Sequence, residues 1–182
     1  MRNGSFLRRR RLLAASAAAL LWGGAPSALP ASADPSRIKI AVFDFEVDDF
    51  SAGAGIAGNN AADLTQLDRA TSEARRLIAE SGRYSIVDVS SAEGEGDAIK
   101  GRSLQQCNGC EAAIALKLGA DQSFVGVVTR ISRTEYTVRF QIRDARTGAL
   151  VLARQSDLRM GADYSWNRGA AALVNNGLLN NP

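Results

Sequence analysis

The apolar residues change their spacing several times along the first half of the chain, and each change predicts an element. Residues 38 to 45, IKIAVFDF, form a nearly continuous apolar run, which predicts a strand buried on both faces of a sheet. From residue 63 to residue 78 the apolar side chains recur at helical spacing, and Ser81-Gly82 is a helix stop. Residues 84 to 89 predict a second, shorter strand.

The second half predicts a helix, three strands and a last helix. A short helix is expected over residues 112 to 118, and an apolar strand over residues 123 to 131. Residues 136 to 143 alternate between apolar and polar, which indicates a half-buried antiparallel strand. A turn ending at Gly148 should return the chain as a partner strand to residue 158. The last helix is expected from Trp166 to Val174.

The resulting order is β-α-β-α-β-β-β-α, which predicts an α+β fold, or a mixed α/β sheet with helices packed on one face. Residues 46 to 60 and 90 to 106 are polar or rich in small residues, so we expect loops there. Two capping boxes, Asp63 with Gln66 and Asn108 with Glu111, are expected to open the first and second helices.

Residues 1 to 33 are typical of an export signal rather than of a folded segment. Arginines precede a short apolar stretch, and Ala31-Ser32-Ala33 matches a cleavage site. We therefore expect cleavage after Ala33, with residues 34 to 182 forming one periplasmic domain without a transmembrane segment. No cysteine lies near the cleavage site, so we expect no lipid anchor. The general and the twin-arginine export routes both stay open.

The charge of the expected exported part differs from that of the whole chain. The chain has 22 basic and 19 acidic residues and a net charge of +3. Five of the arginines, and no acidic residue, lie in residues 1 to 33, so 17 basic and 19 acidic residues remain and the net charge becomes −2. We therefore expect no nucleic-acid partner. The chain has no histidine, which excludes Ser-His-Asp and Cys-His catalysis.

The end of the first strand carries Asp44, Glu46 and Asp48, followed by Gly53-Ala-Gly55-Ile-Ala-Gly58. In an extended chain the three carboxylates would lie on one face and could bind a hard cation such as calcium. The alternative, which we favour, is the solvated exit of a strand. The glycines spell a dinucleotide fingerprint, but they lie too far after the strand for a phosphate to meet a helix start there. We therefore expect no cofactor.

The motif Cys107-Asn-Gly-Cys110 has three interpretations. An oxidising compartment favours a local disulfide. A position at a helix start favours a redox-active pair, because the helix dipole stabilises a thiolate. A metal site or an intermolecular link is the third, although two cysteines do not complete a tetrahedral zinc site.

Four arginines form another candidate site. Arg139 and Arg143 share the polar face of one predicted strand, and Arg154 and Arg159 lie on or after its neighbour. They could bind an acidic partner or a phosphate. The alternative is a solvated sheet face.

Several segments together carry a resemblance to a known family. In order they are IAVFDF, ESGRYSIVD, LGADQSFVGVVTRI and YTVRFQIRDARTGALV, spread over residues 38 to 175. The chain resembles the amino-terminal domain of TolB proteins, is similar to the CsgG-type fold, and looks still closer to an uncharacterised family of short exported proteobacterial proteins. The most specific pieces are Ser81-Gly82-Arg83-Tyr84, Leu118-Gly119-Ala120-Asp121, and Asp144 with Thr147-Gly148.

The resemblance implies a small mixed sheet with helices that binds other envelope proteins and catalyses no reaction. We see neither the β-propeller of TolB nor the pore-forming hairpins of CsgG-type proteins, so it does not imply a particular partner. We therefore expect a non-enzymatic envelope accessory that binds an envelope or exported protein. The alternatives are a thiol–disulfide accessory that uses Cys107 and Cys110, and a protein that binds a cation or a small ligand.

Overall fold

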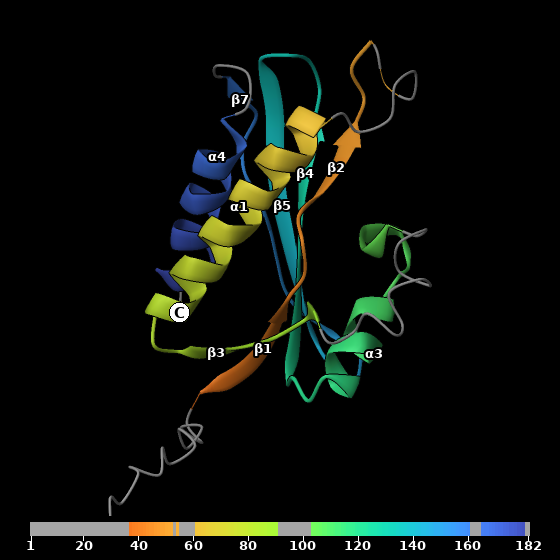
Figure 1. Ribbon diagram of the computed structural model, residues 1–182, viewed down its shortest axis with the longest axis vertical. Coiled ribbons are helices and arrows are strands. Elements are labelled where there is room, and N and C mark those ends of the chain that lie inside the picture. The colour runs from red at the N-terminus through yellow and green to blue at the C-terminus, as the bar shows by residue number, and fades with distance from the viewer. Residues whose placement is uncertain (1–36, 53, 55–60, 91–102, 161–164, 181–182) are drawn as a thin grey trace, which may run out of the picture. The chain divides into compact units, whose positions relative to one another are not determined.

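The computed structural model describes residues 37–52, 54, 61–90, 103–160 and 165–180. The predicted signal lies outside these residues, as do residues 53 and 55–60 of the first predicted loop and residues 91–102 of the second. The strands are β1 (Ile38–Val42), β2 (Glu46–Asp49), β3 (Tyr84–Val87), β4 (Gln122–Arg130), β5 (Glu135–Asp144), β6 (Leu150–Gln155) and β7 (Arg159–Met160). The helices are α1 (Ala61–Glu80), α3 (Cys110–Lys117) and α4 (Trp166–Val174), with a 3-10 turn η2 (Leu104–Gln106) and a π-helical turn η3 (Asn175–Leu179) (Figure 1).

The strands form one mixed sheet in the order β3-β1-β4-β5-β6. Strands β3, β1 and β4 are parallel neighbours, whereas β5 runs antiparallel to both β4 and β6. Two short strands lie off this path, with β2 paired to β4 and β7 paired to β5. The expected α+β class is confirmed, and so is the alternating burial of β5.

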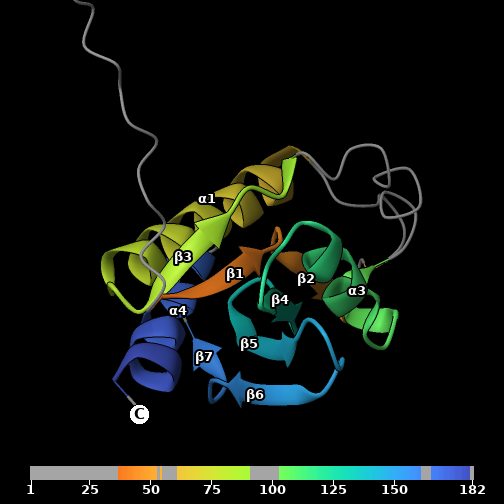
Figure 2. The same cartoon turned by 90° about the horizontal axis from the view of Figure 1, so that it is seen from below.

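The helices cover both faces of the sheet, which corrects the expectation of one covered face. Helices α1 and α4 pack on one face, and α3 packs on the other, as Figures 1 and 2 show. The reason is the strand order, because β1 to β3 moves one way across the sheet and β3 to β4 moves back past β1. Right-handed crossovers in opposite directions place their helices on opposite faces.

The predicted first strand is divided in two, and Phe45 lies at the division. Strand β1 pairs with the start of β4, and β2 pairs with its end. Between them the backbone N–H of Phe45 donates to the hydroxyl of Thr71 on α1, at 2.8 Å. The Phe45 ring packs over Gly126 of β4, where an added Cβ would overlap the ring. Residues 46 to 49 are therefore a strand, and not the start of the expected loop.

Neither capping box has the predicted geometry. Helix α1 begins at Ala61, so Asp63 lies inside its first turn, where the residue is buried and pairs with Arg130. Helix α3 begins at Cys110 with Gly109 as its N-cap, because Asn108 has the positive φ of 52°. The acids of the two predicted boxes, Asp63 and Glu111, pair instead with Arg130 and Arg143, which are distant in sequence.

The C-terminal helix continues past the predicted stop. Helix α4 covers the expected residues, but Asn175 to Leu179 add a π-helical turn. Gly177 lies in this turn, where an added Cβ would press on Arg154 of β6. None of the helices in the described part of the chain is long and apolar enough to span a membrane.

Candidate functional site

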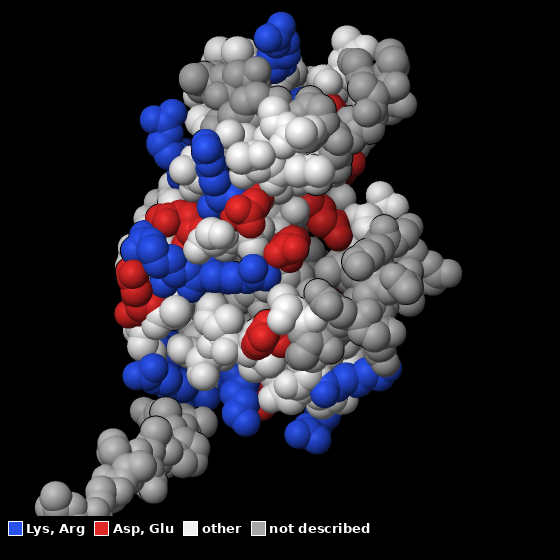
Figure 3. Space-filling view, viewed as in Figure 1, with Lys and Arg blue, Asp and Glu red and all other residues white. Residues whose placement is uncertain are grey.

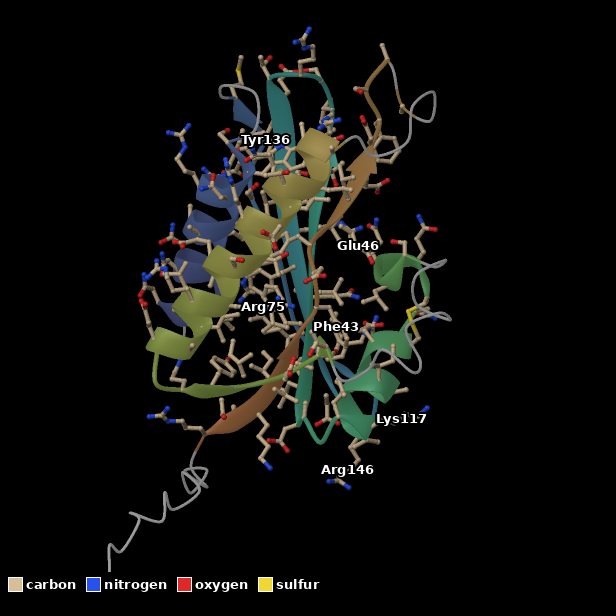
Figure 4. The ribbon with its side chains drawn as sticks, in the orientation of Figure 1. Phe43, Glu46, Arg75, Lys117, Tyr136 and Arg146 are labelled. Carbon is tan, nitrogen blue, oxygen red and sulfur yellow. A yellow bond between two sulfur atoms is a disulfide. The ribbon has the colours of Figure 1, made fainter. Side chains whose placement is uncertain are left out.

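Cys107 and Cys110 are joined by a disulfide directly before α3, with their Cα atoms 5.6 Å apart. The two intervening residues have positive φ, 52° at Asn108 and 108° at Gly109, so the chain turns sharply between the cysteines. Both cysteines are half-buried and pack against the smaller core on the α3 face of the sheet. The disulfide therefore joins the turn to the first residue of the helix (Figure 4).

The segment before the disulfide is fastened to the sheet by Glu46. The carboxylate accepts a hydrogen bond from the hydroxyl of Ser103. It also accepts the backbone N–H groups of Leu104 at 2.6 Å and of Gln105 at 3.2 Å. These are the free N–H groups at the start of η2, which a carboxylate satisfies well. Glu46 thus points from β2 toward η2, as Figure 4 shows, and is occupied by protein groups.

Glu111 holds the start of α3 against β5. The side chain is fully buried, and its Oε1 accepts a hydrogen bond from Gln141 Nε2 at 3.0 Å. Arg143 Nε lies 3.0 Å from the same oxygen as an ion pair, although this N–H has no aligned hydrogen-bond partner. Arg139, four residues before Arg143 on the same face, donates to Gln105 of η2. The arginine-bearing face of β5 therefore binds η2 and the start of α3 within the same chain.

The environment of Cys107 bears on its chemistry. Its Sγ lies 3.1 Å from the carbonyl oxygen of Leu104 and 3.5 Å from Oε2 of Glu111. A disulfide sulfur has no hydrogen to donate, so these are contacts and become hydrogen bonds only after reduction. A thiolate at Cys107 would face a carboxylate, and a nearby negative charge disfavours it. This geometry favours a structural disulfide.

The possible metal ligands fall into two groups. The ligand atoms of Cys107, Cys110 and Glu111 lie within 4.8 Å of one another, the only such cluster among the described residues. In the disulfide form it offers one carboxylate and no thiolate. The candidates Asp44 and Asp48 do not join Glu46 in a cluster within that part of the chain. Asp44 is exposed and pairs with Arg75, 3.0 Å away.

The four candidate arginines divide between the two faces of the sheet. Arg139 and Arg143 face α3. The strand register places Arg154 opposite Phe140 and Arg159 opposite Tyr136, and both aromatic side chains belong to the core under α1 and α4. Arg154 and Arg159 therefore lie on the α4 face and cannot act together with the first pair. Arg159 lies beside α4 and borders a pocket.

Arg130 at the end of β4 holds three elements together. It donates to Asp49 of β2 at 3.0 Å, pairs with buried Asp63 of α1, and lies over the ring of Trp166, 4.8 Å from its centroid. Burial raises the pKa of Asp49, but hydrogen bonds with Ser51 and the charge of Arg130 outweigh it and hold this pKa below its usual value. These groups join the ends of β2 and β4 to the starts of α1 and α4.

The β6 edge of the sheet is an unusually exposed surface. Strand β6 is the last in the order, and all of its residues except Leu152 are exposed. Leu150 and Val151 are 54% and 52% exposed, large values for apolar residues of a strand. In contrast, acidic and basic side chains intermingle over the face of the molecule that carries α1 (Figure 3).

Sequence reasoning did not single out Glu111, Gln105 or Arg168 as functional candidates. Glu111 was interpreted as a capping residue, because its position in the sequence fits that role. The signal that could have indicated burial is its place between Cys110 and the apolar residues Ala112 and Ile114. Arg168 carries no sequence signal, since only the pocket beside it distinguishes it from other surface arginines.

The chain belongs to a family described as "Protein of unknown function (DUF2380)", whose DUF3280 model matches residues 38–178. The expectation of an uncharacterised domain family is thus confirmed. No curated protein matches the chain.

Three solved structures illustrate the likeness of the chain to known proteins. The LpoB C-terminal domain from Salmonella enterica is 16% identical, with 71% of this chain and 88% of that chain covered and a TM-score of 0.48. Lipoprotein GNA1162 from Neisseria meningitidis is 11% identical, with 78% and 94% covered and a TM-score of 0.47. TolB from Acinetobacter baumannii is 14% identical, with 78% and 27% covered and a TM-score of 0.41.

Proposed function

We propose that this protein is a non-enzymatic interaction module of the cell envelope. Its partner is an exported or envelope protein that adds an acidic, extended segment to the free edge of β6. The single observation that carries this proposal is the exposure of β6, an edge strand with apolar side chains in water. Its location in the envelope rests on the signal expected in residues 1 to 33.

The backbone of β6 is suited to strand addition. It pairs with β5 on one side only, and no described strand pairs with its other side. An extended segment would satisfy those N–H and C=O groups, and its side chains would pack against alternate residues of β6. Exposed Leu150 and Val151 provide the apolar part of that contact.

The charge of β6 indicates an acidic partner. Arg154 is the only charged residue in the strand, and it lies near the end opposite Leu150. Arg146 and Asp144 both lie at the turn before β6, and Asp157 lies after its end, so Arg154 alone sets the charge of the strand itself. Opposite charges on directly facing strand positions stabilise the pair. A segment in which apolar and acidic residues alternate therefore fits β6 best.

A direct test uses a synthetic peptide of alternating Val and Glu, and a second peptide with Lys in place of Glu. Hydrogen exchange of backbone amides is measured on the protein purified after export. We expect the Val-Glu peptide to slow exchange saturably in β6, and the Val-Lys peptide to leave it unchanged. Arg154→Glu should abolish or invert this preference, whereas Arg69→Glu, an exposed arginine of α1, should not.

Two results would contradict the proposal. One is equal protection by both peptides, or protection that maps away from β6. The other is self-association, seen by light scattering, in which β6 of one copy pairs with β6 of another. A second copy would then be the occupant of the edge instead of an acidic partner.

The thiol–disulfide accessory stays a second candidate because both cysteines are half-buried at a helix start. Its test is the reduction potential of the Cys107–Cys110 bond. A potential below about −300 mV is typical of a structural disulfide and would exclude the redox role. A potential near those of known exchange proteins, about −120 to −270 mV, would favour it.

A further inference from the structure

A pocket of about 390 Å³ opens between β7 and the start of α4. Its walls come from three parts of the chain, namely β5, residues 158–160 before and in β7, and the start of α4 with the preceding Ser165. The lining residues used below are Tyr136, Leu158, Arg159, Met160, Ser165 and Arg168. No function described above uses this pocket, and it lies on the face of the sheet opposite to the disulfide.

Two arginines give the pocket its charge. Among the described residues, neither Arg159 nor Arg168 has a carboxylate within ion-pair distance, and the described part of the lining contains no Asp or Glu. This differs from Arg75, Arg130 and Arg143, each of which pairs with a carboxylate. Two arginines that line one pocket can form a site for an anion, because a guanidinium presents a fork of donors suited to phosphate or carboxylate.

Arg159 is held in place at an energetic cost. Its Nε is buried and has no hydrogen-bond partner in the part of the chain that the structure describes. Leaving a charged donor unsatisfied costs more than leaving it in water, so the surrounding structure must hold the side chain there. An anion that binds the exposed part of the guanidinium would offset some of this cost.

The wall beside the arginines is rigid. The hydroxyl of Tyr136 donates to the carbonyl oxygen of Ser165 at 3.1 Å, and the Ser165 hydroxyl donates to the Tyr136 oxygen at 3.0 Å. Both side chains are buried. Because the Ser165 hydroxyl is used in this way, it does not cap α4, whose N-terminal end has no side-chain cap. The positive end of the helix dipole adds to the field of the two arginines.

The rim of the pocket is apolar. Leu158 and Met160 line it and are 56% and 77% exposed. Large apolar side chains in water beside a charged site indicate a ligand with an apolar body next to its charged group. Inorganic phosphate would leave this rim uncovered.

We propose that this pocket binds an oxyanion, a phosphate or a carboxylate, carried on a short alkyl group. Arg159 and Arg168 hold the oxyanion, and Leu158 with Met160 covers the alkyl part. The site is independent of strand addition at β6, because Arg154 and the free edge do not line the pocket.

Isothermal titration with hexyl phosphate, hexanoate and inorganic phosphate tests this proposal on the protein purified after export. We expect saturable binding of at least one hexyl ligand, and weaker binding of inorganic phosphate. Arg159→Gln and Arg168→Gln should each weaken binding of that ligand at least about tenfold, the effect of losing a hydrogen bond to a charged group. Arg146→Gln removes the same charge from the turn after β5 and should leave binding unchanged.

The apolar part has its own test. Met160→Ser should weaken binding of the hexyl ligand and leave binding of inorganic phosphate unchanged. The proposal is overturned if no hexyl ligand binds saturably, or if Arg146→Gln weakens binding as much as Arg159→Gln does. Circular dichroism of each variant checks that it is folded. If the Arg159→Gln variant does not fold, Arg159→Lys replaces it. This variant keeps the charge but loses the fork of donors, so it should also bind the hexyl ligand more weakly than the wild type.

Discussion

Glu111 and Arg143 meet across the space between α3 and β5, with Oε1 and Nε 3.0 Å apart. The carboxylate is fully buried, whereas the arginine side chain is 19% exposed. With Gln141 on the same oxygen, the pair joins the helix that carries Cys110 to the longest strand. The face of β5 that the sequence presents as a row of exposed arginines is therefore a half-buried polar layer.

We expect Glu111→Ala to lower the free energy of unfolding by about 3 kcal/mol, because removing one partner leaves the other charge unpaired in a largely buried place. The replacement of both Glu111 and Arg143 by Leu should restore much of the loss. Urea unfolding measures both effects. Glu80→Gln, at an exposed ion pair of α1, should change the value by less than about 0.5 kcal/mol. A loss equally small for Glu111→Ala would show that the pair is not holding α3.

The disulfide should contribute modestly to stability. It closes a loop between residues only three apart in sequence, and the chain-entropy description gives about 2 kcal/mol for such a loop. We therefore expect the double variant Cys107→Ser/Cys110→Ser to unfold at a lower urea concentration and to be insensitive to reductant. The wild type with reductant should match the variant. Binding to a partner that survives in the variant would assign the motif a structural role.

Gly126→Ala should destabilise the fold by about 1–3 kcal/mol, the usual cost of adding volume to a packed core. An added Cβ would overlap the ring of Phe45, which lies directly over the glycine. Phe45→Leu in the same chain should recover part of the loss. A double-mutant cycle by thermal unfolding measures the coupling of the two positions. Additive losses would mean that the ring moves aside freely.

Stability should fall in acid because several carboxylates titrate below their usual range. Hydrogen bonds from Thr147 lower the pKa of Asp144 from its usual value of 3.8. The pKa of Asp49 is also lowered, since hydrogen bonds and Arg130 outweigh the effect of burial. The unfolded chain then takes up protons first as the pH decreases, so this stability is present above about pH 4 and is lost as the pH falls through the folded-state pKa.

Urea unfolding between pH 5 and pH 2.5 measures that loss. Asp144→Asn keeps an oxygen that accepts the turn's hydrogen bonds but removes the titration, so its stability should decline less steeply than that of the wild type. Asp157→Asn, at an exposed acid after β6, should follow the wild type. Parallel curves for wild type and Asp144→Asn would contradict the assignment to Asp144.

The local pattern of apolar residues was enough to predict the elements in which buried residues recur at a regular spacing. The alternation in β5 and the helical spacing in α1 are both set by which residues must leave water. Patterns of polar residues were less informative, because a carboxylate can cap a helix, pair with an arginine or lie in solvent. Asp63 and Glu111 fit capping boxes in the sequence, yet they are buried and pair with Arg130 and Arg143.

The candidate site was predicted in parts but not as an arrangement. The sequence indicates the cysteine motif and the arginines of β5 as separate candidates. In the structure they are neighbours, because Arg143 pairs with Glu111 and Arg139 donates to Gln105, on either side of the two cysteines. Arg154 and Arg159 belong to the other face, because strand register decides which residues share a face. Register depends on pairing with a distant strand, and one sequence does not show it.

The sequence by itself determined the α+β class, the order of the main elements and the positions of the two cysteines, because these depend on local spacing and composition. The tertiary structure decided that helices cover both faces, that Phe45 divides the first strand, and that Arg159 and Arg168 line one pocket. Each of those outcomes requires residues far apart in the chain to come within contact distance. Such contacts follow from packing the whole sheet and not from any one segment.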